Sequence, residues 1–161
     1  MQALTQDLTD TLGPSGFVPV ADPASTIPDA ILLLRRQTWN TNRAVVVVAP
    51  AALPPDFAAW LREIRKRTAY RCRFFPFFYG IGIQVVVIAP GLARSGIDPN
   101  SHVAAIDNQW AIIQSVFLVD PEARTFVAGR TWGQFVTGKY QDAIAAALAR
   151  HFQPAQSAES H

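Results

Sequence analysis

Near both ends of the chain, apolar residues recur with the three-to-four-residue spacing of an amphipathic helix. Leucines four residues apart share one stripe over residues 4–12, and Gly13 followed by Pro14 indicates that this helix stops there. Near the other end, apolar residues four apart predict a helix over residues 138–152. Pro154 then opens a polar tail, so we expect residues 154–161 to be disordered.

The same spacing predicts a further helix over residues 54–68. Pro54 and Pro55 suit its first turn, and Asp56 sits where the helix dipole favours an anion. Beyond residue 68 the period changes to two, because apolar and basic residues alternate, and we expect a strand over residues 70–75. The apolar face of this helix falls within about a third of its circumference and comprises Phe57, Trp60, Leu61, Ile64 and Thr68.

Two apolar runs predict central strands. Residues 43–49 and 84–90 are rich in valine on both faces, which is typical of strands that are covered on both sides. We therefore expect Val46 and Val87 to be almost completely buried in adjacent or near-adjacent strands.

Turn residues between apolar runs predict two hairpins, one with its turn at residues 40–42 (Asn-Thr-Asn) and one with its turn at residues 120–123 (Asp-Pro-Glu-Ala). A short strand over residues 16–20 and a loop over residues 91–102 complete the pattern. The segments that we expect to pair are residues 31–39 with 43–49, and residues 110–119 with 124–130.

Together these elements predict one α+β domain over residues 1–153, with α/β as the alternative class. We expect a mixed, mostly antiparallel sheet of about six or seven strands with two main helices packed on it. One right-handed crossover joins residues 43–49, through the helix at 54–68, to the strand at 70–75. The other neighbours are expected to be antiparallel because their connections are short.

Charge is distributed unevenly along this pattern. Residues 59–75 carry six basic groups against one acid, whereas the remainder of the chain has a net charge of −3. One interpretation is a solvated helix face followed by an edge strand whose arginines discourage association. The other is a surface that binds an anionic or protein partner. The candidate residues for that surface are Arg62, Arg65, Lys66, Arg71 and Arg73.

In the helical projection Arg62 and Lys66 lie opposite the apolar face, and Arg65 lies on its flank. As residues of a working surface, all of the candidates should be largely exposed. Phe74 to Gly80 add a cluster of aromatic residues around one proline, which is more typical of a turn that packs onto its own core than of a base-stacking surface.

Composition fits a soluble, cytoplasmic protein. The lone Cys72 excludes an intrachain disulfide, and the first residues lack the basic start and apolar run of a secretion signal. The longest apolar stretch, residues 44–53, is too short to cross a bilayer, which needs roughly twenty apolar residues. We therefore expect no transmembrane segment.

Residues 133–140 (GQFVTGKY) resemble the phosphate-binding loop of P-loop NTPases, because they match the pattern G-x-x-x-x-G-K between a predicted strand and a predicted helix. Tyr140 stands where that family has a Ser or Thr to hold magnesium, and Phe135 and Val136 are bulky for a loop that wraps phosphate. We interpret Thr137 and Gly138 as a helix cap instead. No cofactor is predicted.

Asp107 and the strand that follows loosely resemble the acidic site of restriction-endonuclease-like nucleases. Gln114 replaces the second acid of that family and Val116 its catalytic lysine, so the resemblance implies a nuclease fold without the reaction. His102, His151 and His161 lack the spacing of metal ligands, and no nucleophile motif surrounds any serine.

Two functions of different classes follow. The first is a small non-catalytic module that binds a protein partner or itself, through the basic helix face or the loop at 91–102. The alternative is a binding module or degenerate nuclease-like domain that acts on nucleic acid or another phosphate-bearing ligand through residues 62–73. We favour the first, and thus no enzymatic activity.

Overall fold

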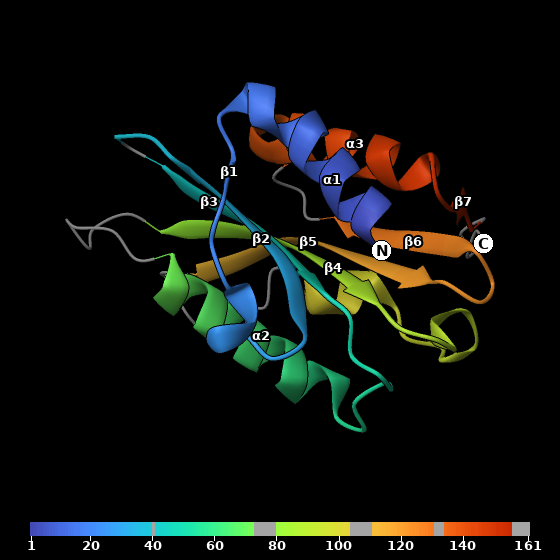
Figure 1. The fold of residues 1–161 in the computed structure, drawn as a ribbon. Coiled ribbons are helices and arrows are strands. Elements are labelled where there is room, and N and C mark those ends of the chain that lie inside the picture. Colours follow the sequence, from blue (N-terminus) through green and yellow to red (C-terminus); the bar gives the residue numbers. More distant parts are fainter. Residues whose placement is uncertain (40, 73–79, 104–110, 131–133, 156–161) are drawn as a thin grey trace.

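The computed structural model describes residues 1–39, 41–72, 80–103, 111–130 and 134–155. In these residues the strands form one seven-stranded sheet in which spatial order equals chain order (Figure 1). The strands are β1 (Val18–Pro19), β2 (Ala30–Gln37), β3 (Asn42–Val48), β4 (Ile81–Ile88), β5 (Ala111–Asp120), β6 (Thr125–Arg130) and β7 (Gln153–Pro154). The helices are α1 (Gln2–Leu12), α2 (Phe57–Arg71) and α3 (Gln134–Ala149).

The helices make the molecule three-layered. Helices α1 and α3 pack side by side on one face of the sheet, and α2 covers the other (Figure 1). Each face has its own core, because successive residues of a strand point to opposite sides. Val46 and Val87 belong to the core under α2, whereas Val45, Val47 and Phe117 belong to the core under α1 and α3.

The sheet is mixed, as predicted, but only half of its pairings are antiparallel. β3, β4 and β5 are parallel, and so are β6 and β7, whereas β1–β2, β2–β3 and β5–β6 are antiparallel. The prediction of a mostly antiparallel sheet is therefore only partly right. The reason is that the connections after β3 and β4 both return the chain to the end of the sheet from which those strands start.

Both predicted hairpins are present, and Val46 and Val87 are fully buried, as expected. They lie in neighbouring strands, where Val46 is opposite Val85 and Val87 is opposite Val48. The first helix also ends where its Gly-Pro signal predicts.

Helix α2 begins and ends later than predicted. Asp56 is its N-cap, and its carboxylate accepts a hydrogen bond of 2.8 Å from the backbone N–H of Ala59. At the other end Tyr70 and Arg71 are still helical, and Cys72 closes the last turn through a bond to the carbonyl of Thr68. A strand over 70–75 is therefore wrong for these residues, while residues 73–75 lie outside the described part. The crossover delivers the chain to β4 instead.

The C-terminal helix starts earlier than predicted, at Gln134. It and α2 are the two main helices that were predicted, and the short predicted helix, α1, packs on the sheet beside it. Thr137 and Gly138 lie inside it, so their interpretation as a cap is wrong. The disordered tail was also placed too early. Pro154 pairs with Phe126 as part of β7, and the N–H of Ala155 donates to the carbonyl of Phe126. Residues 156–161 lie outside the described part of the chain.

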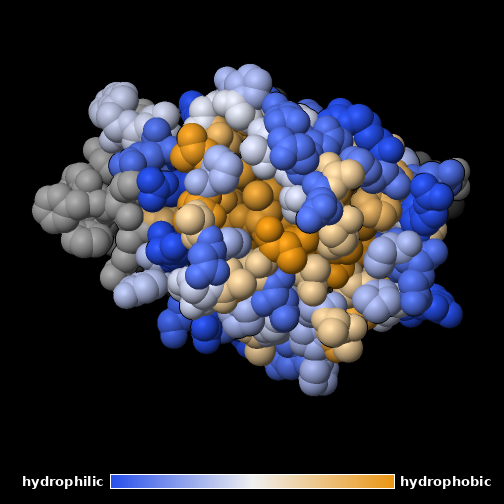
Figure 2. Space-filling model, in the orientation of Figure 1, coloured by the Kyte–Doolittle hydropathy of each residue, from blue (hydrophilic) through white to orange (hydrophobic). Residues whose placement is uncertain are grey.

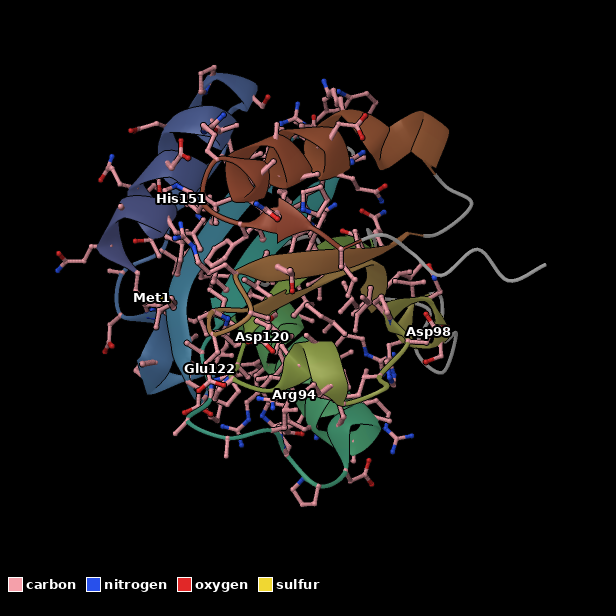
Figure 3. All side chains as sticks on the ribbon, turned by 90° about the vertical axis from the view of Figure 1, so that its right-hand side faces the viewer. Met1, Arg94, Asp98, Asp120, Glu122 and His151 are labelled. Atoms are coloured by element: carbon pink, nitrogen blue, oxygen red, sulfur yellow. The ribbon has the colours of Figure 1, made fainter. Side chains whose placement is uncertain are left out.

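An ionic contact joins the first helix to the end of the last. Arg150 donates to both carboxylate oxygens of Asp7, at 2.8 and 2.6 Å, and to the hydroxyl of Thr11 at 2.7 Å. His151 Nε2 lies 3.0 Å from the same carboxylate, and Figure 3 shows His151 next to α1. The bond from Arg150 lowers the pKa of Asp7, against a rise caused by burial. We call this group the Asp7 clamp.

A second carboxylate fixes the turn between β5 and β6. Asp120 is 2% exposed and accepts bonds from the backbone N–H groups of Ala93, Glu122 and Ala123, at 2.9, 3.0 and 3.1 Å. Figure 3 shows Asp120, Glu122 and Arg94 gathered at this end of the sheet. Burial raises the pKa of Asp120, whereas the three amide hydrogen bonds and Arg94 lower it. The lowering effects together are larger, so the pKa lies below the ordinary value.

In the described residues, no helix has both the length and the apolar character needed to cross a membrane.

Truncation of Val46 or Val87 to alanine should lower the free energy of unfolding by about 1–3 kcal/mol, because each change removes fully buried methyl groups from a packed core. Denaturant unfolding measures the loss. Val18→Ala is the matched control, since Val18 is 53% exposed and should change stability little. Equal effects of the buried and exposed truncations would contradict the two-core arrangement.

Asp120→Asn should cost about 1–2 kcal/mol at pH 7, because an amide cannot serve all three backbone donors. A carboxyl with a lowered pKa stabilises the fold above about pH 4, and this contribution disappears as the pH falls through the folded-state pKa. The variant should therefore lose less stability than the wild type between pH 4 and 2. Unfolding curves across that range, with the exposed Asp10→Asn as control, test this, and parallel curves would refute it.

Candidate anion-binding site at the basic end of the sheet

One end of the sheet carries a concentration of cationic side chains. It is the end at which β3, β4 and β5 begin, and β2 and α2 finish there while α3 starts there (Figure 1, left). We call it the basic end. The described cations that these elements bring to it are Arg35, Arg36, Arg43, Arg71 and Lys139.

Three of these cations surround a single aromatic ring. Relative to the ring centre of Tyr140, the guanidinium carbon of Arg43 lies at 4.8 Å and that of Arg36 at 5.6 Å. The ammonium nitrogen of Lys139 lies at 4.9 Å. Such distances give cation–π attraction. We call Arg36, Arg43, Lys139 and Tyr140 the Tyr140 cluster.

Strand alternation explains why the arginines meet the helix. Arg36 is two residues beyond Leu34, and Arg43 two residues before Val45, both of which belong to the core under α3. Tyr140 is 2% exposed and packs edge-on against Phe17, with 5.3 Å between ring centres. A buried ring, fixed by its contact with Phe17, thus has three cations around it.

The electrostatics of this cluster are unfavourable for the cations alone. Arg43 is 8% exposed, and its pKa is lowered, first by burial and then by repulsion from Arg36, with a partial opposing effect of Tyr140. Arg36 and Lys139 form no ion pair with any residue that the structure describes. An incoming anion would relieve this repulsion.

A buried network of polar side chains lies beside the cluster on the same face. A bulge in β5 accompanies it, because the register with β4 shifts between Ile83 and Gln84. Gln84 Nε2 donates to Gln114 Oε1 at 3.0 Å, and Gln141 Nε2 donates to the carbonyl of Gln114 at 3.1 Å. Ser115 Oγ and Gln84 Oε1 are buried without a partner in the described residues.

Gly82 makes room for this network. It is the register partner of Arg43 in the neighbouring strand, and a Cβ atom at Gly82 would lie only 2.4 Å from Gln114 Oε1. The side chain of Gln114 therefore occupies the place where any other residue at 82 would carry its own. This close approach explains a glycine inside a buried strand.

The basic residues predicted from the sequence lie elsewhere. Arg62 and Lys66 are exposed on α2, which covers the opposite face from the Tyr140 cluster. Arg71 is exposed and donates to the carbonyl of Ala21 at 3.1 Å. Arg73 lies outside the described residues. The structure thus places Arg62 and Lys66 as expected but does not bring them together with Arg36 and Lys139.

The expected exposure of Arg65 is wrong, since this side chain is 6% exposed. Helix α2 buries a wider face than the projection suggests, because Arg65 lies next to the buried Ile64 and one turn before Thr68 and Ala69. Arg67, which was not a candidate, is bound to Glu63 at 2.7 Å and to the carbonyl of Thr26.

Neither family resemblance matches the geometry. Residues 134–140 are helical, whereas a phosphate-binding loop precedes its helix. In the nuclease-like segment, Gln114 joins the amide network, but Val116 points to the opposite core. Asp107 lies outside the described residues. In the described part of the chain, no three His, Cys, Asp or Glu residues gather as metal ligands would.

Two other surface features compete with the basic end. A hollow of about 510 Å³ is lined by Arg124 and residues 149–154, but Arg150 and His151 are engaged in the Asp7 clamp. Figure 2 shows apolar surface over β1 and β2, where Val18 and Ile31 are exposed. Neither feature combines buried polar groups with cations that, like Arg36 and Lys139, form no ion pair in the described residues, and the Tyr140 cluster is therefore the stronger candidate.

Comparison with protein-family models, curated proteins and solved structures gives no significant match. The functional argument therefore rests on the chemistry of the site.

Gly82→Ala should lower the free energy of unfolding by about 1–3 kcal/mol. The new methyl group would displace the side chain of Gln114, and Gln84 Nε2 would lose its buried acceptor. Gly13→Ala is a suitable control, because Gly13 has φ −51° and open space around it, so alanine should be tolerated there. Denaturant unfolding of both variants tests the close approach, and equal stabilities would contradict it.

Proposed function

We propose that the protein is a non-catalytic binding module that holds an acidic segment of a protein partner against the basic end of its sheet. The observation that carries this proposal is the Tyr140 cluster, in which Arg36 and Lys139 gather around one ring without an ion pair in the described residues. Because burial and the repulsion between Arg36 and Arg43 disfavour the charged state of Arg43, the cluster favours a partner of opposite charge.

The contrast with the opposite end of the sheet supports the proposal. There two of the cations lie beside acids: Arg94 is 3.7 Å from Glu122, and Arg150 is 2.6 Å from Asp7. Asp56 and Asp120 occupy helix-cap and turn positions at that same end. The molecule is thus electrically asymmetric along its strands, and an acidic segment would be drawn to one end.

An exposed aromatic residue adds an anchor of the kind that protein interfaces use. Trp39 follows β2 at the basic end, three residues after Arg36, and is 85% exposed. Tryptophan and arginine are over-represented among the residues that dominate binding energy between proteins. A partner segment that combines acidic residues with an apolar one would contact both features.

The chemistry of the cluster supports binding over catalysis. Arginine keeps its charge in proteins, so Arg36 and Arg43 are poor general acids or bases. The exposed pair Arg62 and Lys66 on α2 favours a second candidate, which is the binding of nucleic acid or another phosphate-bearing ligand on the opposite layer.

A labelled decapeptide of alternating glutamate and glycine with one central leucine should bind the wild type, with affinity that falls as salt rises. Trp39→Ala and Lys139→Ala should each weaken binding at least about fivefold, the size expected for interface residues that matter. Fluorescence anisotropy measures this. Arg94→Ala, which removes an exposed cation from the opposite end, is the matched control and should bind normally.

A single-stranded oligonucleotide of equal length separates the two candidates. If it binds more tightly than the acidic peptide, and Arg62→Ala with Lys66→Ala abolishes that binding, the nucleic-acid function replaces the proposed one. Absence of acidic-peptide binding at low salt would also overturn the proposal.

A further inference from the structure

Resting on the proposed function, we infer that the Tyr140 cluster is a subsite for one phosphoryl group carried by a side chain of the protein partner. The cluster supplies three cationic groups within 6 Å of a single ring centre, and two of them are guanidinium forks. Clusters of arginine are a recurring means of recognising phosphorylated segments.

The charge of the site suits a phosphoryl group better than a carboxylate. A carboxylate brings one negative charge and two acceptor oxygens. A phosphorylated side chain brings about −1.5 to −2 charges at pH 7 and three strong acceptor oxygens. Three cations around one ring, of which Arg36 and Arg43 repel each other, are matched more closely by the second ligand.

The depth of the site also fits a compact, highly charged group. Arg43 is 8% exposed, Arg36 is half-buried and Lys139 is exposed. The cluster therefore combines a buried cation with cations that a ligand can reach from the surface. Partly desolvated arginines bind oxyanions more strongly than exposed ones, because water competes less.

Buried polar groups continue the site on the same face. Ser115 is opposite Gln84 in the neighbouring strand, and Gln84 is two residues beyond Gly82, the register partner of Arg43. Ser115 Oγ is buried and has no partner in the described residues. A hydroxyl in that state carries a desolvation cost, and together with Gln84 it makes the sheet polar beside the cluster on the face that α3 covers.

The test compares three labelled peptides of one sequence, with phosphoserine, glutamate or serine at the central position, in fluorescence anisotropy at pH 7. The phosphorylated peptide should bind at least about tenfold more tightly than the glutamate peptide. Because the second phosphate pKa is about 6, its affinity should also rise between pH 5 and 7, whereas that of the glutamate peptide should not.

Two variants locate the subsite. Arg36→Gln and Lys139→Gln should each reduce the affinity for the phosphorylated peptide about tenfold and abolish most of its advantage over the glutamate peptide. Lys66→Gln is the matched control, because Lys66 is an exposed lysine on the opposite layer. Thermal unfolding verifies that all three variants fold, so Arg43, which is buried, need not be changed.

The outcomes separate this inference from the proposed function. Equal affinities of the phosphorylated and glutamate peptides, or an advantage that survives both variants, overturn the phosphoryl subsite and leave the binding module intact. Failure of all three peptides overturns both. Inorganic phosphate alone should compete only at millimolar concentration. Competition at the concentration of the peptide itself, or tighter binding to vesicles that contain a phosphoinositide, would assign the phosphoryl group to another source and overturn the inference.

Discussion

Coverage of both faces of β3, β4 and β5 is the constraint on which the rest of this structure depends. Parallel neighbours cannot be joined by a tight turn, so the chain must cross a face of the sheet between them, and α2 makes the first crossing. The valines of these strands then serve two cores, with Val46 on one side and Val45 and Val47 on the other. Helices from both ends of the chain, α1 and α3, are needed to close the second core.

The same constraint creates the basic end. Parallel strands start at one edge, so the first polar residues of three strands become neighbours although they are far apart in sequence. Arg43 thereby lies beside Gly82, and the amide of Gln114 fills the space that Gly82 leaves. Helix α3 begins at this edge, and its Tyr140 ring contacts Arg36 and Arg43. A polar group inside an otherwise apolar sheet is thus a product of strand direction.

The elements that could be predicted are those with strong local signals. The valine runs, both hairpins and the leucine stripe of α1 follow from periods and turn residues, and Asp56 was placed at the start of its helix. Strand direction has no such signal, because a run such as residues 84–90 is equally apolar in either orientation. The end of α2 was missed for a related reason, since Tyr70, Arg71 and Cys72 suit either a strand or the last turn of a helix.

The candidate site was not predictable from local pattern. Two of its cations come from the β2–β3 hairpin and the third from α3, which lies about a hundred residues further along the chain. The helix that carries Lys139 was expected to start only after a Thr-Gly cap. The sequence drew attention to the basic residues of α2 because they are adjacent along the chain. A weaker signal did exist, since Arg36 and Arg43 stand at the polar ends of otherwise apolar strands, in register with the apolar residues of the face that α3 covers. Only the packing of α3 on that face brings both arginines to Tyr140.

The Asp7 clamp has a practical consequence for how the protein can be immobilised. It holds α1 against the end of α3. Strand β7 comes next in the chain and forms the edge of the sheet opposite to β1. The N-terminus and β7 both lie on the side of the molecule away from the basic end (Figure 1). A surface or bead joined through Met1 would therefore leave the Tyr140 cluster facing outward, in an orientation that a soluble ligand can reach.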